Sequence, residues 1–377
     1  IRRPPRSTPS NSSAASDVYK RQEIQRCKYF GKCGGCTLQH LPYDEQIELK
    51  KEKLKKLFCS IEIIPSPKIY EYRNRIDVAI TDKGIGFREK NKWWKIVNID
   101  ECKLFGRRSK LVLEKLKEFI RDFKLEPFNL RKSKGFLRYI VLREGKFTGE
   151  LMINLVTYKG KLPEEIKNYF DFANSLYWSI NETKSDISYG KPEKFWGKEY
   201  IEEKLNGIRY LIHPNTFFQT NSYQTQKLIK IVEKFSEGSK VLDLYCGVGT
   251  FSIYLAKKGF ETAGSDINQL SIEIAKKNAE INSANVKFCI CSDRKIDNLK
   301  YDTIIIDPPR CGVHPKLIKK ILKERPKNIV YVSCNPKSLK DNVEKLSEIY
   351  RMENIIALDM FPQTMHIETV MNLKLRN

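Results

Sequence analysis

A cysteine at the end of a predicted strand is the side chain best placed to do chemistry in this sequence. Residues 328–332 are rich in β-branched and aromatic side chains, which predicts a buried parallel strand that stops at Ser333-Cys334-Asn335-Pro336. Because ligands bind at the carboxyl ends of parallel strands, Cys334 would face a pocket, where its thiolate is a strong nucleophile. Taken alone, an inert core cysteine is the plain alternative.

A second group of cysteines has the spacing of a metal site. Cys27, Cys33 and Cys36 follow the pattern C-x5-C-x2-C, and the two glycines before Cys36 let the backbone fold tightly. An iron–sulfur cluster or a closed zinc site usually takes four ligands. We prefer Cys102 to Cys59 as the fourth, because Cys102 follows a hairpin-like run whereas Cys59 ends a predicted helix. The spacing alone leaves cluster and zinc open.

Two glycines follow the predicted strand 240–244, in the segment DLYCGVGTF at residues 243–251. Glycines at such a turn allow the main chain to approach a nucleotide closely. Asp266 ends the next predicted strand, where it can accept from ribose hydroxyls, and Asp293 ends the third, where it can take an adenine amino group. The third glycine of the dinucleotide pattern is missing. The pattern therefore favours S-adenosylmethionine over NAD.

The fourth predicted strand ends at Asp307-Pro308-Pro309-Arg310. The prolines have no backbone donors, and Asp307 could bind the polar edge of a nucleobase. By itself the motif is similar to the Asn/Asp-Pro-Pro-Tyr of amino-methylating enzymes. Arg310 in the place of tyrosine, with Cys334 one strand further on, indicates a different chemistry.

Two predicted domains must position these residues. Residues 23–212 alternate short strands with few helices, which predicts a strand-rich α+β domain. Residues 213–377 alternate helices and strands regularly, which predicts a doubly wound, Rossmann-like sheet. Residues 1–22 are rich in Ser, Pro and Arg, lack an initiator Met and resemble translated adapter sequence, so they are excluded from the fold prediction.

The composition points to a polyanionic partner. The net charge is +23 with pI ≈ 9.4, although a lysine-rich solvated surface is the plain alternative. The stretches 73–75 and 90–94 mix cations with polar or aromatic side chains, which suits RNA as well as it suits a solvated surface. No apolar run is long enough to span a membrane, and ten cysteines without a signal peptide argue for reduced thiols. We therefore expect a cytoplasmic monomer that binds RNA and no membrane.

Six motifs occur in an order that is similar to one family. They are Cys27/Cys33/Cys36, Phe217-Phe218-Gln219-Thr220-Asn221, residues 243–251, residues 307–310, residues 333–336 and Met365-His366-Ile367-Glu368. Over residues 27–377 the chain resembles the RNA uracil-5-methyltransferases, in their iron–sulfur-containing 23S ribosomal RNA branch. Such relatives often carry an RNA-binding β-barrel before the first cysteine. None precedes Cys27 here, and we expect a truncation at the adapter-like segment.

The resemblance implies a class I methyltransferase fold and a role for each motif. It implies that Cys334 is the nucleophile and Glu368 the base. The other implied residues are the [4Fe–4S] ligands Cys27, Cys33, Cys36 and Cys102, and the S-adenosylmethionine and substrate residues Gln219, Tyr245, Asp266 and Asp293, with Asp307 beside them. Asp266 stands where many relatives have Glu.

The expected function is methylation of uracil C5 in 23S rRNA. Carbon 5 is a poor nucleophile until a thiolate adds at C6, and a base must then remove the C5 proton. Transfer RNA as substrate and a non-catalytic iron–sulfur RNA-binding protein are the alternatives. A cytosine-5-methyltransferase is disfavoured, because Arg310 separates Pro309 from Cys311 where such enzymes usually have Pro-Cys.

Overall fold

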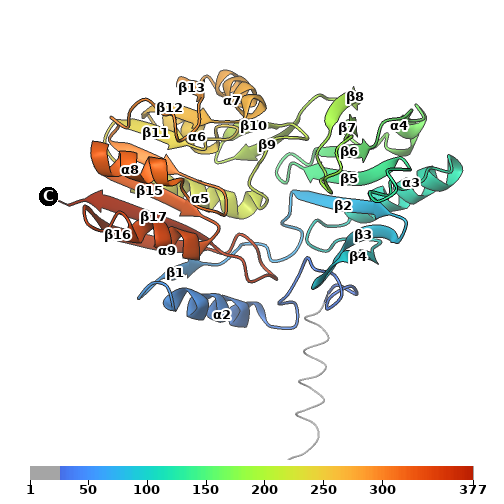
Figure 1. The fold of residues 1–377 in the computed structure, drawn as a ribbon, viewed down its shortest axis with the longest axis horizontal. Coiled ribbons are helices and arrows are strands. Elements are labelled where there is room, and N and C mark those ends of the chain that lie inside the picture. The colour runs from blue at the N-terminus through green and yellow to red at the C-terminus, as the bar shows by residue number, and fades with distance from the viewer. Residues whose placement is uncertain (1–25, 377) are drawn as a thin grey trace, which may run out of the picture.

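The computed structural model describes residues 26–376, which form two lobes (Figure 1). One lobe is built on an eight-stranded sheet and the other on a seven-stranded sheet. The hairpin of β9 (Ile201–Leu205) and β10 (Ile208–Ile212) lies between them (Figure 1). No helix within residues 26–376 is long and apolar enough to cross a bilayer. The adapter-like segment 1–22 lies outside the described residues.

All strands of the eight-stranded sheet except β1 come from the second half of the chain. Its order is β1-β16-β17-β15-β14-β11-β12-β13. The strands are β1 (Glu62–Ile64), β11 (Lys240–Leu244), β12 (Glu261–Asp266), β13 (Val286–Ile290), β14 (Thr303–Ile306), β15 (Asn328–Ser333), β16 (Tyr350–Leu358) and β17 (Glu368–Leu375). Strands β11 to β15 are parallel, and β17 is antiparallel to both of its neighbours. This topology confirms the α/β methyltransferase-type sheet.

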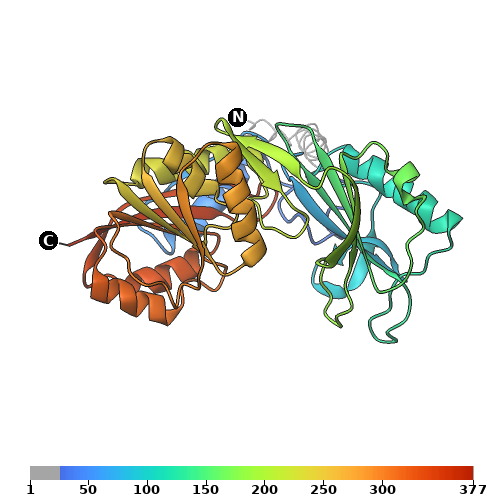
Figure 2. The same cartoon turned by 90° about the horizontal axis from the view of Figure 1, so that it is seen from above.

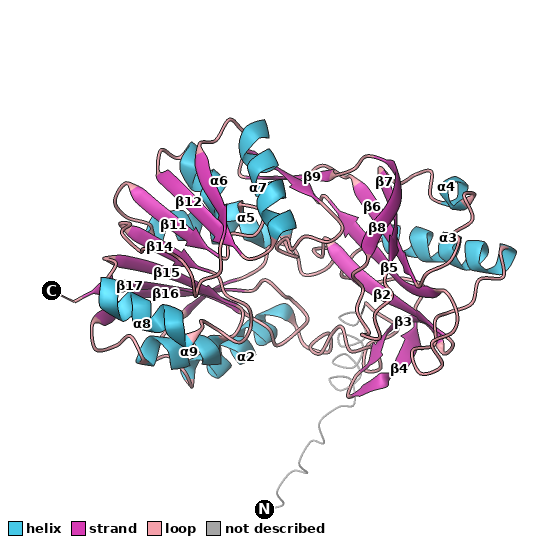
Figure 3. Ribbon diagram, turned by 45° about the horizontal axis from the view of Figure 1, so that its top comes forward, coloured by secondary structure: helices cyan, strands magenta, loops and turns pink. Residues whose placement is uncertain are grey.

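Helices cover both faces of this sheet (Figures 2 and 3). One apolar core joins it to α5 (Ser222–Phe235), α6 (Thr250–Lys257) and α7 (Gln269–Ile281). A second core joins the opposite face to α2 (Tyr43–Lys55), α8 (Pro315–Glu324) and α9 (Pro336–Glu344). Both faces of the central strands are therefore buried, as their continuous apolar runs predict.

The seven-stranded sheet forms the other lobe, in the order β4-β3-β2-β5-β6-β7-β8. The strands are β2 (Arg75–Thr81), β3 (Gly84–Glu89), β4 (Lys92–Asn98), β5 (Leu137–Glu144), β6 (Leu151–Thr157), β7 (Ser175–Ile180) and β8 (Lys191–Gly197). Helices α3 (Arg108–Asp122) and α4 (Ile166–Tyr169) share an apolar core with it. The predicted strand-rich domain is present.

The two lobes do not divide the chain in strict sequence order. Strand β1 pairs in parallel with β16, with Ile63 opposite Ala357, and Leu54 of α2 packs in the core of the same sheet. Residues of the predicted first domain thus complete the second sheet. A three-residue strand has almost no alternation to detect, and its partner lies nearly 300 residues away. The boundary at residue 212 stays a prediction.

Candidate active site

Cys334 and Glu368 lie across from each other at one edge of the eight-stranded sheet. The antiparallel strands β15 and β17 end their ladder with Ser333 opposite Thr369. Cys334 follows Ser333 and Glu368 precedes Thr369, so both stand one position beyond that pair. Glu368 is 3% exposed, and Cys334 is half-buried. The pairing register thus places the predicted nucleophile and base together.

The charges at this edge act on one another. Burial raises the pKa of the Glu368 carboxyl well above its usual range, and the nearby Asp307 charge raises it further. Burial also raises the pKa of the Cys334 thiol, and the Glu368 and Asp307 charges raise it further. Arg310 lowers the pKa of both Cys334 and Glu368. These four residues, brought from β14, β15 and β17, form one electrostatic unit.

Arg310 is a neighbour of Cys334 to which no role in the site was assigned from the sequence. Its Nη2 lies 2.9 Å from Nδ1 of His366, and its carbonyl accepts from Asn335 Nδ2 at 3.0 Å. Burial and the Arg310 charge lower the pKa of His366. Arg310 therefore ties the loop after β14 to residues beside both Cys334 and Glu368. Its position just past a strand end, next to the β15 strand, is the signal that could have revealed it.

Gln219 brings the segment before α5 to the same edge. Its side-chain Nε2 donates to Asp307 Oδ2 at 3.3 Å, and its carbonyl accepts from Asn74 Nδ2 at 2.7 Å. Burial raises the pKa of Asp307, and the charge of Asp243 raises it further. The structure thus joins Gln219 to Asp307, whose charge acts on Cys334 and Glu368.

The loop between β11 and α6 is a tight turn with open space in front of it. Tyr245, Gly247 and Gly249 have φ values of 64°, 54° and 85°. A Cβ at Gly249 would lie 2.8 Å from the Ile253 side chain, which makes glycine necessary there. Within residues 26–376, nothing lies within 4 Å of a Cβ built at Gly247. The Gly247 main chain is therefore accessible to a ligand.

Acidic side chains surround this loop at the carboxyl ends of the strands. Asp266 accepts from the backbone N–H of Gly247 at 3.0 Å and of Asn268 at 2.8 Å. Asp293 accepts from the hydroxyl of Tyr245 at 2.7 Å. Tyr245, Asp266 and Asp293 are thus brought together, as predicted.

Asp243, near the end of β11, is a further buried acid, and it was assigned no role from the sequence. Its Oδ2 accepts from Ser252 Oγ at 2.6 Å, while Oδ1 is buried with no hydrogen-bond partner among residues 26–376. Burial raises the pKa of Asp243 to about 7. The open backbone at Gly247 and the unused buried acceptor on Asp243 fit the donor-rich nucleoside and amino-acid parts of S-adenosylmethionine.

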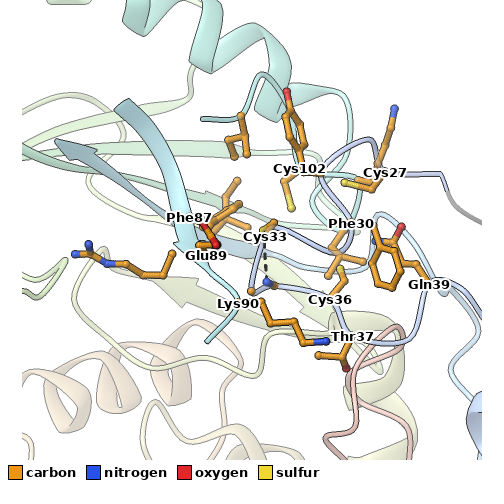
Figure 4. Close-up of a pocket in the computed structure, with 18 of the residues that line it drawn as sticks. Cys27, Phe30, Cys33, Cys36, Thr37, Gln39, Phe87, Glu89, Lys90 and Cys102 are labelled. Atoms are coloured by element: carbon orange, nitrogen blue, oxygen red, sulfur yellow. Dashed lines mark hydrogen bonds between the residues drawn. The ribbon is translucent and has the colours of Figure 1, made fainter. Parts of the chain in front are cut away.

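The four predicted metal-ligating cysteines line one cavity in the other lobe (Figure 4). The cavity measures about 620 Å³, and Cys27, Cys33, Cys36 and Cys102 all contribute to its wall. Burial raises the pKa of Cys33 to about 11 and of Cys36 to about 12, and it also raises that of Cys102. The negative charge of Cys102 raises the pKa of Cys33 and of Cys36, so these thiols are close enough to interact.

A buried cation faces these thiols. The Arg73 charge lowers the pKa of Cys33, Cys36 and Cys102. Arg73 Nε is buried and has no hydrogen-bond partner in the described part of the chain. As placed, no group of three or more His, Cys, Asp or Glu side chains within residues 26–376 is arranged to hold a metal ion. The donor set and the facing cation fit an anionic thiolate cluster, but the predicted cluster itself is not observed.

A sequence model of the family described as tRNA (Uracil-5-)-methyltransferase matches residues 42–296 and 287–376. The chain belongs to this family. Its members are S-adenosylmethionine-dependent RNA uracil-C5-methyltransferases, so the family predicted from the six motifs is confirmed.

Two relatives in this family are named for different RNAs. The tRNA (uracil(54)-C(5))-methyltransferase of Pyrococcus furiosus is 58% identical over 350 residues, covering 93% of this chain and 85% of that protein. The 23S rRNA (uracil(747)-C(5))-methyltransferase of Pyrococcus abyssi is 47% identical over 358 residues, covering 93% and 86%. Membership of the uracil-5-methyltransferase family therefore does not by itself separate the predicted ribosomal RNA substrate from transfer RNA.

A solved structure from the same family supports the fold. It is the tRNA (uracil-54, C5)-methyltransferase of Pyrococcus abyssi in complex with S-adenosyl-L-homocysteine. It is 55% identical, has a TM-score of 0.84 and covers 90% of this chain and 86% of that chain. The agreement extends over both lobes of this uracil-5-methyltransferase.

Proposed function

We propose that this protein converts a uridine of transfer RNA to 5-methyluridine, with Cys334 as nucleophile and Glu368 as base. The observation that carries the proposal is the register that sets these two side chains across from each other at the β15–β17 edge. A non-catalytic RNA-binding role would not require both groups there.

The reaction divides between the two side chains. The Cys334 thiolate forms a bond to C6, and the C5–C6 π electrons move onto the C4 carbonyl as an enolate. S-adenosylmethionine supplies an electrophilic methyl group, which C5 takes up. Glu368 then accepts the C5 proton, the C5–C6 double bond re-forms, and the Cys334–C6 bond breaks. The target base must leave the RNA stack to reach Cys334.

The neighbouring polar groups are proposed to orient the two reactants. Gln219 and Asp307, joined by a hydrogen bond, present an amide and a carboxyl to the polar edge of uracil. Burial raises the pKa of Asp307 to about 7, so near neutral pH its carboxyl carries a proton in part of the molecules and can then donate to a uracil carbonyl. Tyr245, Asp266 and Asp293 are proposed to hold the cofactor beside the open backbone at Gly247.

The choice of transfer RNA rests on the relatives. Identity is 58% to an enzyme named for tRNA uracil 54 and 47% to one named for 23S rRNA uracil 747. Ribosomal RNA, predicted from the cysteine motif, is the second candidate. Mapping 5-methyluridine in both RNAs after incubation with active protein and with Cys334→Ala tests this. New methylation confined to 23S rRNA would make ribosomal RNA the substrate instead of transfer RNA. No new methylation in either RNA would reject the proposed activity.

Cys27, Cys33, Cys36 and Cys102 are proposed to hold a [4Fe–4S] cluster. The support is their common cavity and the buried Arg73 charge, which would offset the negative charge of the thiolates. Methyl transfer needs no redox step, so the role is structural. Anaerobic purification followed by iron and sulfide analysis should find about four of each per chain. Stoichiometric zinc without sulfide would replace the cluster with a zinc site.

A further inference from the structure

Two neighbouring tryptophans are exposed on an edge strand. Trp93 and Trp94 of β4 are 73% and 49% exposed, and their ring centroids lie 6.0 Å apart with planes at 89°. Strand β4 is the outermost strand of the seven-stranded sheet, so one row of its backbone groups has no ladder partner within that sheet. Two indoles at an open edge form an apolar surface of the kind that marks an interaction site.

The surroundings of the two tryptophans are basic. Residues 83–95 contain Lys83, Arg88, Lys90, Lys92 and Lys95 and a single acid, Glu89. Lys92 pairs with Glu89, and Arg88 pairs with Asp186. Within residues 26–376, the other three lysines form no ion pair. The indoles therefore lie among cations that are available to bind an anion.

A groove runs beside the tryptophans on the surface of the lobe. It measures about 420 Å³, and four cations outnumber two acids in its lining, which includes Trp93, Trp94, Tyr139, Lys83, Arg88, Arg131, Arg138, Asp82 and Asp186. Lys132 and Lys134 follow Arg131 in the same exposed loop. Aromatic side chains alternating with cations along a groove are what single-stranded nucleic acid requires, because bases stack on the rings while phosphates meet the cations.

The β3–β4 hairpin is held in place by the cysteine-bearing segment. The N–H of Gly34 donates to the carbonyl of Arg88 at 2.9 Å, and the N–H of Lys90 donates to the carbonyl of Lys32 at 2.8 Å. Cys33 and Glu89 also form a bridge between these segments. Trp93 itself borders the thiol cavity. The tryptophans are thus presented on a fixed support, which lowers the ordering cost of binding.

We infer that Trp93 and Trp94 form a stacking platform for unpaired nucleotides of the substrate RNA, outside the pocket that receives the reactive uracil. A second copy of the chain could also pair with the β4 edge. However, that arrangement would bring two clusters of unpaired lysines together, whereas RNA supplies the opposite charge. This inference rests on the proposed RNA methylation.

The test compares RNA binding by three variants with the wild type, using a tRNA transcript and oligouridylate at fixed salt. Trp93→Ala/Trp94→Ala should raise Kd for both RNAs roughly tenfold or more, because base–aromatic stacking is lost. Trp93→Phe/Trp94→Phe should retain most of the affinity. Phe172→Ala removes another exposed aromatic ring of the same lobe and should leave Kd unchanged. Calorimetric affinity for S-adenosylhomocysteine should be the same in all.

A second readout does not depend on measured affinity. RNA should quench the tryptophan fluorescence of the wild-type protein, and the Phe double variant should lose most of that quenching. Unchanged Kd in the Ala double variant, equal loss in Phe172→Ala, or a wild-type dimer that the Ala variant dissociates would overturn the platform. Failure of the proposed function looks different, because wild-type protein would then bind RNA without forming 5-methyluridine.

Discussion

Glu368 lies across from Cys334, and its charge raises the pKa of the thiol that must ionise to attack uracil. The proposed nucleophile thus lies beside the proposed base, which accepts the C5 proton so that the Cys334–C6 bond can break. Arg310 is the cation that opposes this effect, since it lowers the pKa of both side chains. Burial and the Glu368, Asp307 and Arg310 charges therefore act together on the pH at which the pair can work.

Arg310→Ala should shift the rising limb of the pH–rate profile to higher pH. Removing the cation raises the pKa of Cys334 and of Glu368, and both must lose a proton to act, so the active form appears later as pH rises. Single-turnover methyl transfer across a pH series measures the limb. Arg310→Lys keeps the charge and should shift it less. A limb that stays in place in Arg310→Ala would show that Arg310 does not act electrostatically.

Asp266→Ala should weaken binding of S-adenosylhomocysteine by roughly 1–3 kcal/mol, because the ligand loses a charged hydrogen-bond acceptor. Asp266 also accepts from the N–H groups of Gly247 and Asn268, so loss of loop structure must be distinguished from loss of a ligand contact. Thermal unfolding without ligand provides that control, and Glu273→Ala on the exposed side of α7 is the matched variant. Unchanged affinity in calorimetry would place the ribose elsewhere.

Gln363 fixes the segment that leads to Glu368. Its backbone is left-handed with φ of 69°, and its carbonyl accepts from the N–H groups of Thr37 and Leu38 at 2.8 and 3.1 Å. Gln46 of α2 exchanges hydrogen bonds with it, from Gln46 Nε2 to Gln363 Oε1 and from the Gln363 N–H to Gln46 Oε1, both 3.0 Å. Because Thr37 directly follows Cys36, this contact also joins the cysteine-bearing segment to the catalytic edge.

Gln46→Ala should lower kcat roughly ten- to a hundredfold by misplacing Glu368. The KM for RNA should stay nearly constant, because the Gln46 side chain is buried and does not contact RNA directly. Glu45→Ala, an exposed change on the same helix, is the control. Steady-state kinetics measures kcat and KM separately for each variant. Parallel changes in kcat and KM would indicate general unfolding rather than a positioning role.

The buried ion pair between Lys50 and Asp359 fastens α2 to the end of β16. The Lys50 Nζ to Asp359 Oδ1 distance is 2.6 Å, and both side chains are 0% exposed. Lys50→Met should reduce the free energy of unfolding by about 3–5 kcal/mol at neutral pH, because an unpaired carboxylate is left buried. Urea unfolding measures this loss.

The pH dependence of that loss identifies its cause. Burial raises the pKa of Asp359, and removing Lys50 raises it further. Between the unfolded-state and folded-state pKa values the folded variant holds a proton that the unfolded chain releases, so the defect should shrink as pH falls through the folded-state pKa toward the ordinary carboxyl value. A defect that stays constant as pH falls would attribute the loss to packing.

Much of the catalytic sheet was predictable because its signals are local. The apolar run before Cys334 and the Gly-x-Gly after Leu244 each specify a strand end without reference to the rest of the chain. The pairing of β1 with β16 was not predictable, because three residues carry no periodicity and the contact is distant in sequence. Strands β7 and β8 have mixed burial patterns, which break the alternation expected of half-buried strands.

In the candidate site, too, local signals were predictable and contacts between distant segments were not. Cys334 and Asp307 could be recognised because each directly follows a predicted strand, and Glu368 only because its motif resembles that of the family, whereas the contact of Arg310 with His366 depends on two loops folding together. The link from Thr37 to Gln363 likewise joins segments more than 300 residues apart. Contacts of this kind depend on tertiary structure and leave no local signal.

Trapping of the covalent protein–RNA adduct tests the central assignment of Cys334 and Glu368 most directly. Labelled substrate RNA is incubated with each protein and S-adenosylmethionine, and the adduct is resolved on denaturing gels. Wild type should show little adduct with ordinary RNA and a stable one with 5-fluorouridine RNA, which has no removable C5 proton. Glu368→Gln should transfer the methyl group and accumulate adduct with ordinary RNA, while Cys334→Ala should form none with either RNA. An adduct that persists in Cys334→Ala would move the nucleophile to another cysteine and contradict the account.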